Sequence, residues 1–413
     1  MIYIHIPFCR SFCTYCDFYS EAVPAGCAGS RKAEFEQGLF LKYQNALCAE
    51  ILSRRSEITS EINTLYIGGG TPSVLPPSFF EAVLEALSHA GVRTDFDEFT
   101  VEVNPEDVVE KGEEYIRALA RMGVNRISMG VQSFDDGILK WMNRRHNAQT
   151  ARRAYEIIES AGMDNISIDL IFGLGQLSPD RWEDTVHQAL AISSVGKMPS
   201  HVSAYQLSVE PGSMLAEFVR RGTFREASQE ECRLQYDILC RVLKEAGYHH
   251  YEISNFSLPG KEAVHNSAYW EHVPYSGFGP GAHSFLLSED FDNQPVIMRK
   301  WNKSDLKAYL EYFCRTGERG DCADSSIPVN TLDSVNPVVG SETLTKDQYD
   351  LETLMLSLRT SKGVDEGFLR AHSDSRALEK MISCGCLVPA MNGRIRIPEE
   401  SFFISDGIIA EIA

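Results

Sequence analysis

The sequence has little positive charge and no long apolar run. Lysine and arginine number 39 against 58 aspartate and glutamate residues, so the formal net charge is −19. Such a surface repels phosphate backbones, and we therefore expect no nucleic-acid partner. No uninterrupted apolar stretch approaches the ~18 residues that a membrane-spanning helix needs.

The N-terminal stretch also lacks the features of a secretory signal. MIYIHIPFC carries no basic segment, and Pro7 follows very few apolar residues. We therefore expect a cytoplasmic protein, in which cysteines stay reduced and clustered ones more often bind metal than pair. Most of the scattered cysteines read as small core residues. The Cys384-Gly385-Cys386 pair has no further Cys or His near it, so we interpret it as core or surface thiols.

What the sequence does have is a tight cysteine triad in CRSFCTYCDF, residues 9–18. Its members follow the spacing C-x3-C-x2-C and are Cys9, Cys13 and Cys16. A structural zinc site would need four protein ligands, and no fourth Cys or His lies at a suitable spacing. An iron–sulfur cube with three thiolate ligands leaves one iron open for a small molecule. We favour the iron–sulfur interpretation, with zinc as the alternative.

Short apolar strands alternate with amphipathic helices over the first half of the chain, which is typical of a parallel α/β sheet. The predicted strands are Ile2–Ile6, Thr64–Ile67, Phe99–Val103, Arg126–Val131, Ile166–Ile171 and His201–Leu207. The predicted helices are Leu39–Arg54, Ser78–Ala90, Glu113–Met122, Ala148–Ala161 and Arg181–Ile192. Six strands are too few for a complete eight-stranded barrel. A partial, open barrel and a doubly wound sheet both fit.

The pattern changes after about residue 209, so we expect three domains, 1–209, 210–300 and 301–413. Further helices are predicted at Ser228–Ala246 and Ser304–Arg315, and from Leu344 onward. Tyr248–Phe285 reads as irregular structure with short strands, and Cys322–Ser341 as a linker or loop. A turn at Asn392-Gly393 predicts a hairpin. Helices followed by this hairpin suggest a winged-helix-like C-terminal unit.

Polar residues stand at or near the ends of the predicted strands. In parallel barrels the active face lies at the C-terminal ends of the strands. The residues concerned are the cysteine triad, Gly68-Gly69-Gly70-Thr71-Pro72, Glu102, Gln132 and Asp169. The glycines could form a simple tight turn, cradle a phosphate, or let the backbone approach a ligand. Asp169 interrupts an apolar strand, where a charge without a partner is costly. Arg144 could bind a carboxylate or be a solvated arginine.

These motifs resemble the radical SAM superfamily, in which the open iron of a 4Fe–4S cluster binds S-adenosylmethionine (SAM) and the reduced cluster cleaves it to a 5′-deoxyadenosyl radical. The resemblance implies a partial (βα)6 barrel. It also implies that Tyr15 lies against the adenine and that further residues contact SAM: Tyr3, Gly69, Gly70, Thr71, Glu102, Gln132, Arg144 and Asp169. The sequence departs from the family pattern at Met142–His146, so Arg145 could take the role of Arg144, and at Gly173-Leu174-Gly175.

The stretches YIHIPFC, YIGGGTPS, NRISMGVQSF, ISIDLIFGL and YEISNF narrow the resemblance to the branch of oxygen-independent coproporphyrinogen III oxidases (dehydrogenases) and haem chaperones. The oxidases carry another Cys two residues after the triad, where this chain has Phe18, and an N-terminal extension before the first strand. HNSAYW, residues 265–270, matches the haem-binding HNxxYW motif of the chaperones. The haem residues implied by that match are His265, Asn266, Tyr269 and Trp270. The residues alone favour a loop with a satisfied histidine and core aromatics, and only the resemblance favours haem; His283 is an alternative ligand.

The resemblance favours a haem chaperone with haem, SAM, an electron donor and a haem-acceptor protein as partners. Any membrane association would then come only through the acceptor. The alternative is SAM-dependent decarboxylation of coproporphyrinogen III. A third class, radical chemistry on a tRNA base or in methyl transfer, is disfavoured by the acidic charge and the missing RNA-binding extension.

Overall fold

The computed structural model describes residues 1–23, 30–58, 63–289, 295–317 and 339–413. The chain forms two compact units, each assembled from separate segments. Unit 1 contains residues 1–128, 157–163 and 274–343, and unit 2 contains residues 129–156, 164–273 and 344–413. The three-domain division by sequence pattern stays a prediction.

Unit 1 is built on a parallel sheet with the strand order β11-β1-β4-β5. Its strands are β1 (Ile2–Ile6), β4 (Thr64–Gly69), β5 (Glu98–Val103) and β11 (Ser276–Phe278). Residues of β1 and β4 pair in register, with Tyr3 opposite Tyr66. Two short strands, β2 (Phe8–Cys9) and β3 (Glu21–Ala22), also pair in parallel. The strands are rich in β-branched and aromatic residues and buried on both faces, as parallel sheets require.

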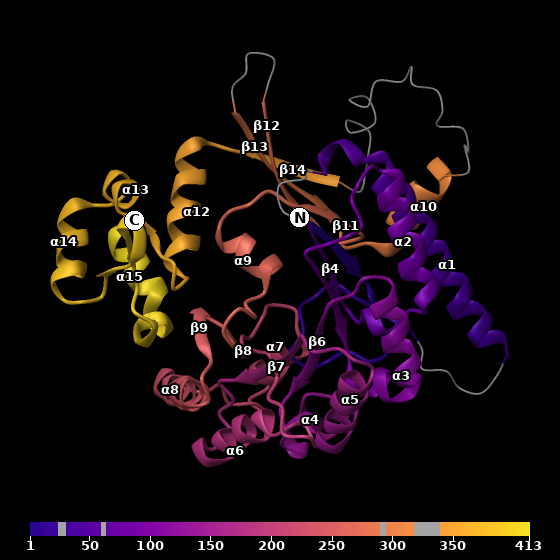
Figure 1. Ribbon diagram of the computed structural model, residues 1–413, viewed down its shortest axis with the longest axis horizontal. Helices are drawn as coiled ribbons and strands as arrows, with labels where there is room; N and C mark the ends of the chain where they lie inside the picture. The colour runs from indigo at the N-terminus through magenta and orange to yellow at the C-terminus, as the bar shows by residue number, and fades with distance from the viewer. Residues whose placement is uncertain (24–29, 59–62, 290–294, 318–338) are drawn as a thin grey trace. The chain divides into compact units, whose positions relative to one another are not determined.

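Long helices pack together within unit 1, where α1 lies beside both α2 and α10 (Figure 1). The helices are α1 (Ser30–Ser53), α2 (Pro77–His89), α3 (Pro105–Arg121) and α10 (Leu306–Gly317). A further sheet, β12-β13-β14, consists of β12 (His283–Glu289), β13 (Pro295–Asn302) and β14 (Val339–Leu344). The predicted linker therefore needs correction: residues 339–341 belong to β14, and 322–338 lie outside the described residues.

A buried charge cluster joins α1 to the late segment of unit 1. Glu50 pairs with Arg54 at 2.6 Å and also accepts hydrogen bonds from the Gly279 amide, the Asn302 amide and the Tyr309 hydroxyl. Arg54 pairs with Glu57 as well, at 2.7 Å. Burial disfavours the charged guanidinium, but the two carboxylates outweigh burial and raise the pKa of Arg54. The cluster thus fixes Gly279, Asn302 and Tyr309 against the first helix.

Unit 2 contains the strand order β7-β8-β10-β9. The parallel pair is β7 (Ile166–Phe172) and β8 (His201–Gln206), and the antiparallel edge is β10 (Asn255–Ser257) and β9 (His249–Glu252). β6 (Arg126–Gln132) contains the boundary between the units. Helices of this unit are α4 (Asp136–Trp141), α6 (Pro179–Leu190), α7 (Met214–Arg220), α8 (Gln229–Glu245) and α9 (Val264–Trp270); α5 (Ala148–Ser160) spans residues of both units.

The C-terminal part of unit 2 joins helices to a small antiparallel sheet, β15-β17-β16. Its elements are α12 (Lys346–Leu358), β15 (Val364–Asp365), α13 (Glu366–Ala371), α14 (Ser375–Ser383), β16 (Val388–Pro389), β17 (Arg394–Arg396) and α15 (Ser405–Ile412). β16 and β17 form the predicted hairpin, and Asn392 and Gly393 both have positive φ, as a tight turn there requires.

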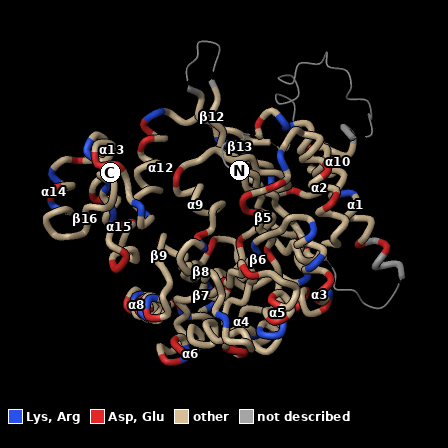
Figure 2. The backbone as a smooth tube through the Cα atoms, in the orientation of Figure 1, with Lys and Arg blue, Asp and Glu red and all other residues tan. Residues whose placement is uncertain are grey.

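All six predicted strands are confirmed to within two residues at each end, and each is followed along the chain by a helix. Helix predictions are less complete: α1 begins nine residues earlier than expected, and α9 lies inside the stretch predicted as irregular. Within the described ranges, none of the helices is long and apolar enough to cross a membrane. Figure 2 shows acidic and basic residues interspersed along helices such as α8, whose sequence carries both signs.

Candidate functional site

The cysteine triad lies in a closed loop of unit 1. Cys9 ends β2, and the Val23 amide donates to the Cys9 carbonyl at 2.8 Å. The Glu21 amide donates to the Pro7 carbonyl at 2.7 Å, so both ends of the loop are tied together. All three cysteines are partly accessible. The fold therefore holds three thiols within one tethered loop directly after the first strand.

The donors of the loop are compatible with a cluster of several irons. Nowhere in the described residues do three His, Cys, Asp or Glu side chains gather around one point, as a mononuclear metal would require. The thiolates of a cubane can bind different irons, so they need not converge on one point. The hydroxyl of Thr14, between two of the cysteines, is buried and has no hydrogen-bond partner among the described residues. Three thiols and an unsatisfied donor suit a sulfide-bearing group.

At each of the three glycines of the turn, a larger side chain would collide with neighbouring atoms of the protein. A side chain at Gly68 would meet the Glu102 carboxylate at 2.7 Å. Gly69 has a φ of +104°, and a Cβ there would lie 2.6 Å from the His5 ring. A Cβ at Gly70 would meet the Phe8 carbonyl at 2.7 Å. Close packing thus explains the run, and Gly68 and Gly69 belong to β4 rather than following it.

The turn is linked directly to the first cysteine. The Thr71 hydroxyl donates to the Cys9 sulfur at 3.4 Å. The side-chain amide of Asn104 donates to the same Thr71 hydroxyl at 3.2 Å and fixes its orientation. Two predicted site residues, Thr71 and Cys9, are therefore in direct contact, and Asn104 supports that contact.

Glu102 is anchored against the glycine turn. Its carboxylate accepts from the Tyr66 hydroxyl at 2.7 Å and from the Gly69 amide at 3.1 Å. Tyr66 in turn lies beside Tyr3, with ring centroids 6.1 Å apart. Burial, and then the Glu102 charge, raise the pKa of Tyr3, so its hydroxyl keeps its proton. Tyr66 is a site residue that the sequence interpretation missed, because an aromatic in a strand looks like ordinary core.

His5 connects this network to Tyr19, which follows the cysteine triad in the chain. Its Nε2 lies 2.8 Å from the Tyr19 carbonyl, and its Nδ1 lies 3.1 Å from the Tyr3 hydroxyl. Since a carbonyl can only accept, Nε2 carries the proton and Nδ1 accepts from Tyr3. Burial lowers the pKa of His5, which favours this neutral form. Unit 1 thus gathers Tyr3, Gly69, Thr71 and Glu102 around strands β1, β4 and β5, while Tyr15 lies half-buried in the cysteine loop.

Within unit 2, Gln132 has a strained backbone. Gln132 is the last residue of β6 and has a φ of +68°. The residues on either side of it are joined by a hydrogen bond, in which the Ser133 amide donates to the Val131 carbonyl at 2.9 Å. A three-residue turn with positive φ is a rare, strained γ-turn. Strain of this kind clusters at functional sites, which supports the prediction for Gln132.

The end of β6 is held by two side chains from the segment after α4. Arg144 donates to the Gly130 carbonyl at 2.8 Å, and His146 Nε2 lies 3.0 Å from the Val131 carbonyl. Arg145 between them is exposed. The sequence left open whether Arg144 or Arg145 takes the predicted role, and Arg144 is the one directed at the end of the strand.

Asp169 belongs to a polar row across unit 2. It is the one partly exposed residue of β7, and it lies opposite Ser203 of β8. Ser203 lies opposite Asn255 of β10. Asn255 in turn lies opposite Glu252 of β9. Directly opposite residues point to the same face of a sheet. Glu252 is fully buried, and burial raises its pKa to about 7. Glu252 and Asn255 come from YEISNF, and nothing but the resemblance had drawn attention to them.

The HNSAYW motif forms the short helix α9. His265 is fully buried, and its Nε2 lies 3.0 Å from the Tyr269 hydroxyl. Asn266, Tyr269 and Trp270 are partly accessible. His283, in unit 1, is exposed, and its ring stacks on Trp301 with centroids 6.1 Å apart. His265 is thus a buried histidine with a hydrogen-bond partner, as in the interpretation that needs no haem.

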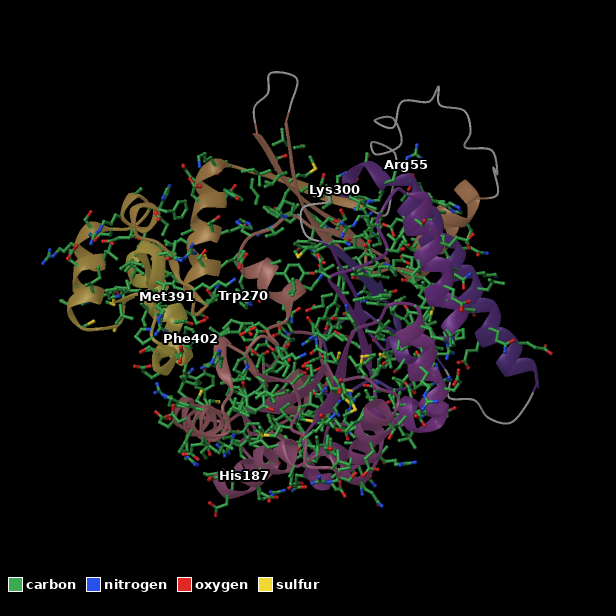
Figure 3. All side chains as sticks on the ribbon, viewed as in Figure 1. Arg55, His187, Trp270, Lys300, Met391 and Phe402 are labelled. Carbon is green, nitrogen blue, oxygen red and sulfur yellow. The ribbon has the colours of Figure 1, made fainter. Side chains whose placement is uncertain are left out.

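Trp270 opens onto a groove within unit 2. The groove has a volume of about 1440 Å³. Its lining residues come from two segments, 240–271 and 353–400, and include Trp270 and Met391. Both side chains are labelled in Figure 3. Cations and aromatics line it together, among them Lys244, Tyr251 and Arg394. A groove of this size could accept a large planar ligand.

Comparison with known proteins places these features in one family. The radical SAM superfamily profile matches residues 3–189. A HemW haem chaperone from Synechocystis is 32% identical over 365 residues, which is 88% of this chain and 78% of the relative. The HemW of Lactococcus lactis is 36% identical over 291 residues, covering 70% of this chain and 71% of the relative.

A solved structure shares the fold. The coproporphyrinogen III oxidase HemN of Escherichia coli, described as a radical SAM enzyme, superposes with a TM-score of 0.74 at 20% identity. The match covers 99% of this chain and 89% of that one. At this identity the likeness supports the fold alone.

Proposed function

Because the chain belongs to the radical SAM superfamily, in the branch that contains HemW and HemN, we propose that it is a haem chaperone that binds haem and passes it to an acceptor protein. The observation that carries this proposal is the 32% identity over 365 residues to a HemW haem chaperone. The HNSAYW motif in α9 supports it.

The cysteine triad is proposed to hold a 4Fe–4S cluster, and the residues beside it to bind SAM. When bound, the pair would supply one-electron cleavage of SAM to a 5′-deoxyadenosyl radical. In unit 1, Thr71 would orient the Cys9 sulfur, and the anchored Glu102 would face the ligand with Tyr3 and Gly69. In unit 2, Gln132, Arg144 and Asp169 are the proposed contacts. An electron donor is a proposed partner.

Haem is proposed to bind at α9. Trp270 and Tyr269 would pack on the macrocycle, beside Asn266. For His265 to become an axial ligand, its Nε2 must exchange the Tyr269 hydroxyl for iron. The exposed His283 needs no such exchange, which keeps it as the alternative ligand. The winged-helix-like character of the C-terminal helices and hairpin is likewise proposed.

The second candidate function is decarboxylation of coproporphyrinogen III, since the branch to which the chain belongs also contains HemN, a coproporphyrinogen III oxidase. Phe18 stands against it, because it occupies the position of the further cysteine in that enzyme group. It is 68% exposed and so is no part of a packed core.

Anaerobic haem titration of His265→Ala and His283→Ala tests the proposed haem site. We expect His265→Ala to lose at least ~10-fold in haem affinity and to change the optical spectrum of bound haem, since an axial ligand sets the iron's electronic state. His283→Ala should bind as the unchanged protein does. The reverse result would assign the ligand to His283, and an unchanged spectrum in both variants would contradict histidine ligation at either position. Tyr269→Phe is the matched control, because it frees His265 Nε2 and should not weaken binding.

A further inference from the structure

Two cysteines touch at the end of helix α14, far along the chain from the triad (α14 in Figure 1). The sulfur atoms of Cys384 and Cys386 lie 3.3 Å apart. Neither residue takes part in the proposed function. The sequence interpretation treated them as ordinary thiols because no further ligand stands near them.

The backbone of the helix end brings the two side chains together. Gly385 has a φ of +77°, the left-handed conformation that ends many helices. The Gly385 amide donates to the Ile382 carbonyl at 3.1 Å, and the Cys386 amide donates to the Met381 carbonyl at 3.0 Å. These two bonds define a Schellman motif. The sequence Cys-Gly-Cys therefore places its two cysteines on either side of a fixed turn, independently of side-chain rotamers.

The two thiols differ in exposure and in acidity. Cys384 is exposed and Cys386 is partly buried. The Cys386 amide and thiol, together with nearby Lys380, lower the pKa of Cys384, whereas the hydrogen bond to Cys384 raises the pKa of Cys386. An accessible, acidic thiol beside a less acidic one is the arrangement of an attacking and a resolving cysteine.

A metal explains the pair less well. A stable zinc site needs further ligands, and in the ranges that the structure describes no third His, Cys, Asp or Glu joins the two sulfurs. A disulfide needs no further ligand, and its formation would bring the sulfurs from 3.3 Å to ~2.05 Å. The short distance between the two sulfur atoms therefore favours disulfide formation over metal binding.

We propose that Cys384 and Cys386 form a thiol–disulfide exchange site whose substrates are small accessible disulfides such as oxidised glutathione. The Cys384 thiolate attacks one sulfur of the substrate disulfide, the substrate S–S bond breaks, and one thiol leaves. The Cys386 thiol, losing its proton, then attacks the Cys384 sulfur of the mixed disulfide and displaces the second thiol. One dithiol and one disulfide thus become one internal disulfide and two thiols, with no other oxidant. This activity goes beyond haem binding and does not depend on it.

Peptide mass spectrometry tests the proposal in the full chain. Trypsin should release residues 381–394 as one peptide, because cleavage follows Lys380 and Arg394 and this peptide holds no other cysteine. After anaerobic incubation of the reduced protein with oxidised glutathione and alkylation, we expect this peptide to be two hydrogens lighter and unalkylated. Excess reduced glutathione should restore two alkylated cysteines. Two free thiols, or one glutathione on each cysteine, would overturn the proposal.

Single substitutions separate the two roles. Cys386→Ser should trap a glutathione on Cys384, because nothing resolves the mixed disulfide. Cys384→Ser should leave Cys386 at least ~10-fold less reactive than Cys384 is in the other variant, because Cys386 is the less accessible of the two. Equal trapping at both positions would contradict the assigned order. Cys240 is the internal control: burial raises its pKa to about 12, so it should stay unmodified in the same samples.

Discussion

At the scale of single residues, the site depends on contacts that fix reactive groups. Thr71 contacts Cys9, Glu102 is bound to Tyr66 and to the glycine turn, and Gln132 has a strained backbone. The spacing of the cysteine triad predicts a cluster site from the sequence alone, and that role stays a prediction. Tyr66 and Asn104 were not, because their roles come from hydrogen bonds between strands that sequence patterns do not carry.

Glu252 gives a prediction about pH and stability. Its pKa rises from the ordinary carboxyl range to about 7 on folding, so between those values the folded state binds more protons than the unfolded chain. The contribution of Glu252 to the free energy of unfolding therefore falls as pH rises through that window and stays low above it. Glu252→Gln, which is always neutral, should gain stability relative to the unchanged protein by up to ~3 kcal/mol between pH 5 and pH 8.

Urea unfolding at both pH values measures this difference. The exposed Glu245→Gln, at the end of α8, is the matched control and should show no such trend. A stability difference for Glu252→Gln that does not change with pH would contradict a raised pKa.

At the scale of elements, the strands were predicted better than the helices. The six predicted strands, which are β1, β4, β5, β6, β7 and β8, carry dense β-branched and aromatic residues, which give a clear signal. The first turns of α1 are polar and carry no apolar period, so the sequence showed only its later part. α9 has seven residues, too few to establish a helical period, and was missed for that reason.

The Glu50 cluster gives a prediction at this scale, because it holds α1 to Gly279, Asn302 and Tyr309. The Glu50 side chain is fully buried, and Glu50→Ala would leave Arg54 with only one of its two carboxylates. We expect the free energy of unfolding to fall by roughly 3–5 kcal/mol, as when one partner of a buried ion pair is removed.

Glu113→Ala is the control, because Glu113 and Arg117 have the same i,i+4 spacing but are 40% and 50% exposed. It should cost less than ~1 kcal/mol. Equal losses in the two variants, measured by denaturant unfolding, would show that the buried cluster does not stabilise unit 1.

At the scale of the whole molecule, the family and the α/β class were readable from the sequence, whereas the segments that make up the two compact units were not; the three-domain division stays a prediction. Each compact unit combines segments from distant parts of the chain, such as residues 1–128 with 274–343. Composition shifts along the sequence report local pattern, whereas the units depend on which segments pack together. The same limit applies to His265, whose complete burial and contact with Tyr269 no motif could reveal.

The central claim is that this radical SAM protein handles haem rather than coproporphyrinogen III. The most direct test reconstitutes the cluster anaerobically, titrates haem, and in parallel supplies coproporphyrinogen III with SAM and a reductant. We predict stoichiometric haem binding and no decarboxylated product, with Cys13→Ala losing the cluster spectrum as the control. Turnover of coproporphyrinogen III without stable haem binding would contradict the claim and assign the chain to porphyrin synthesis.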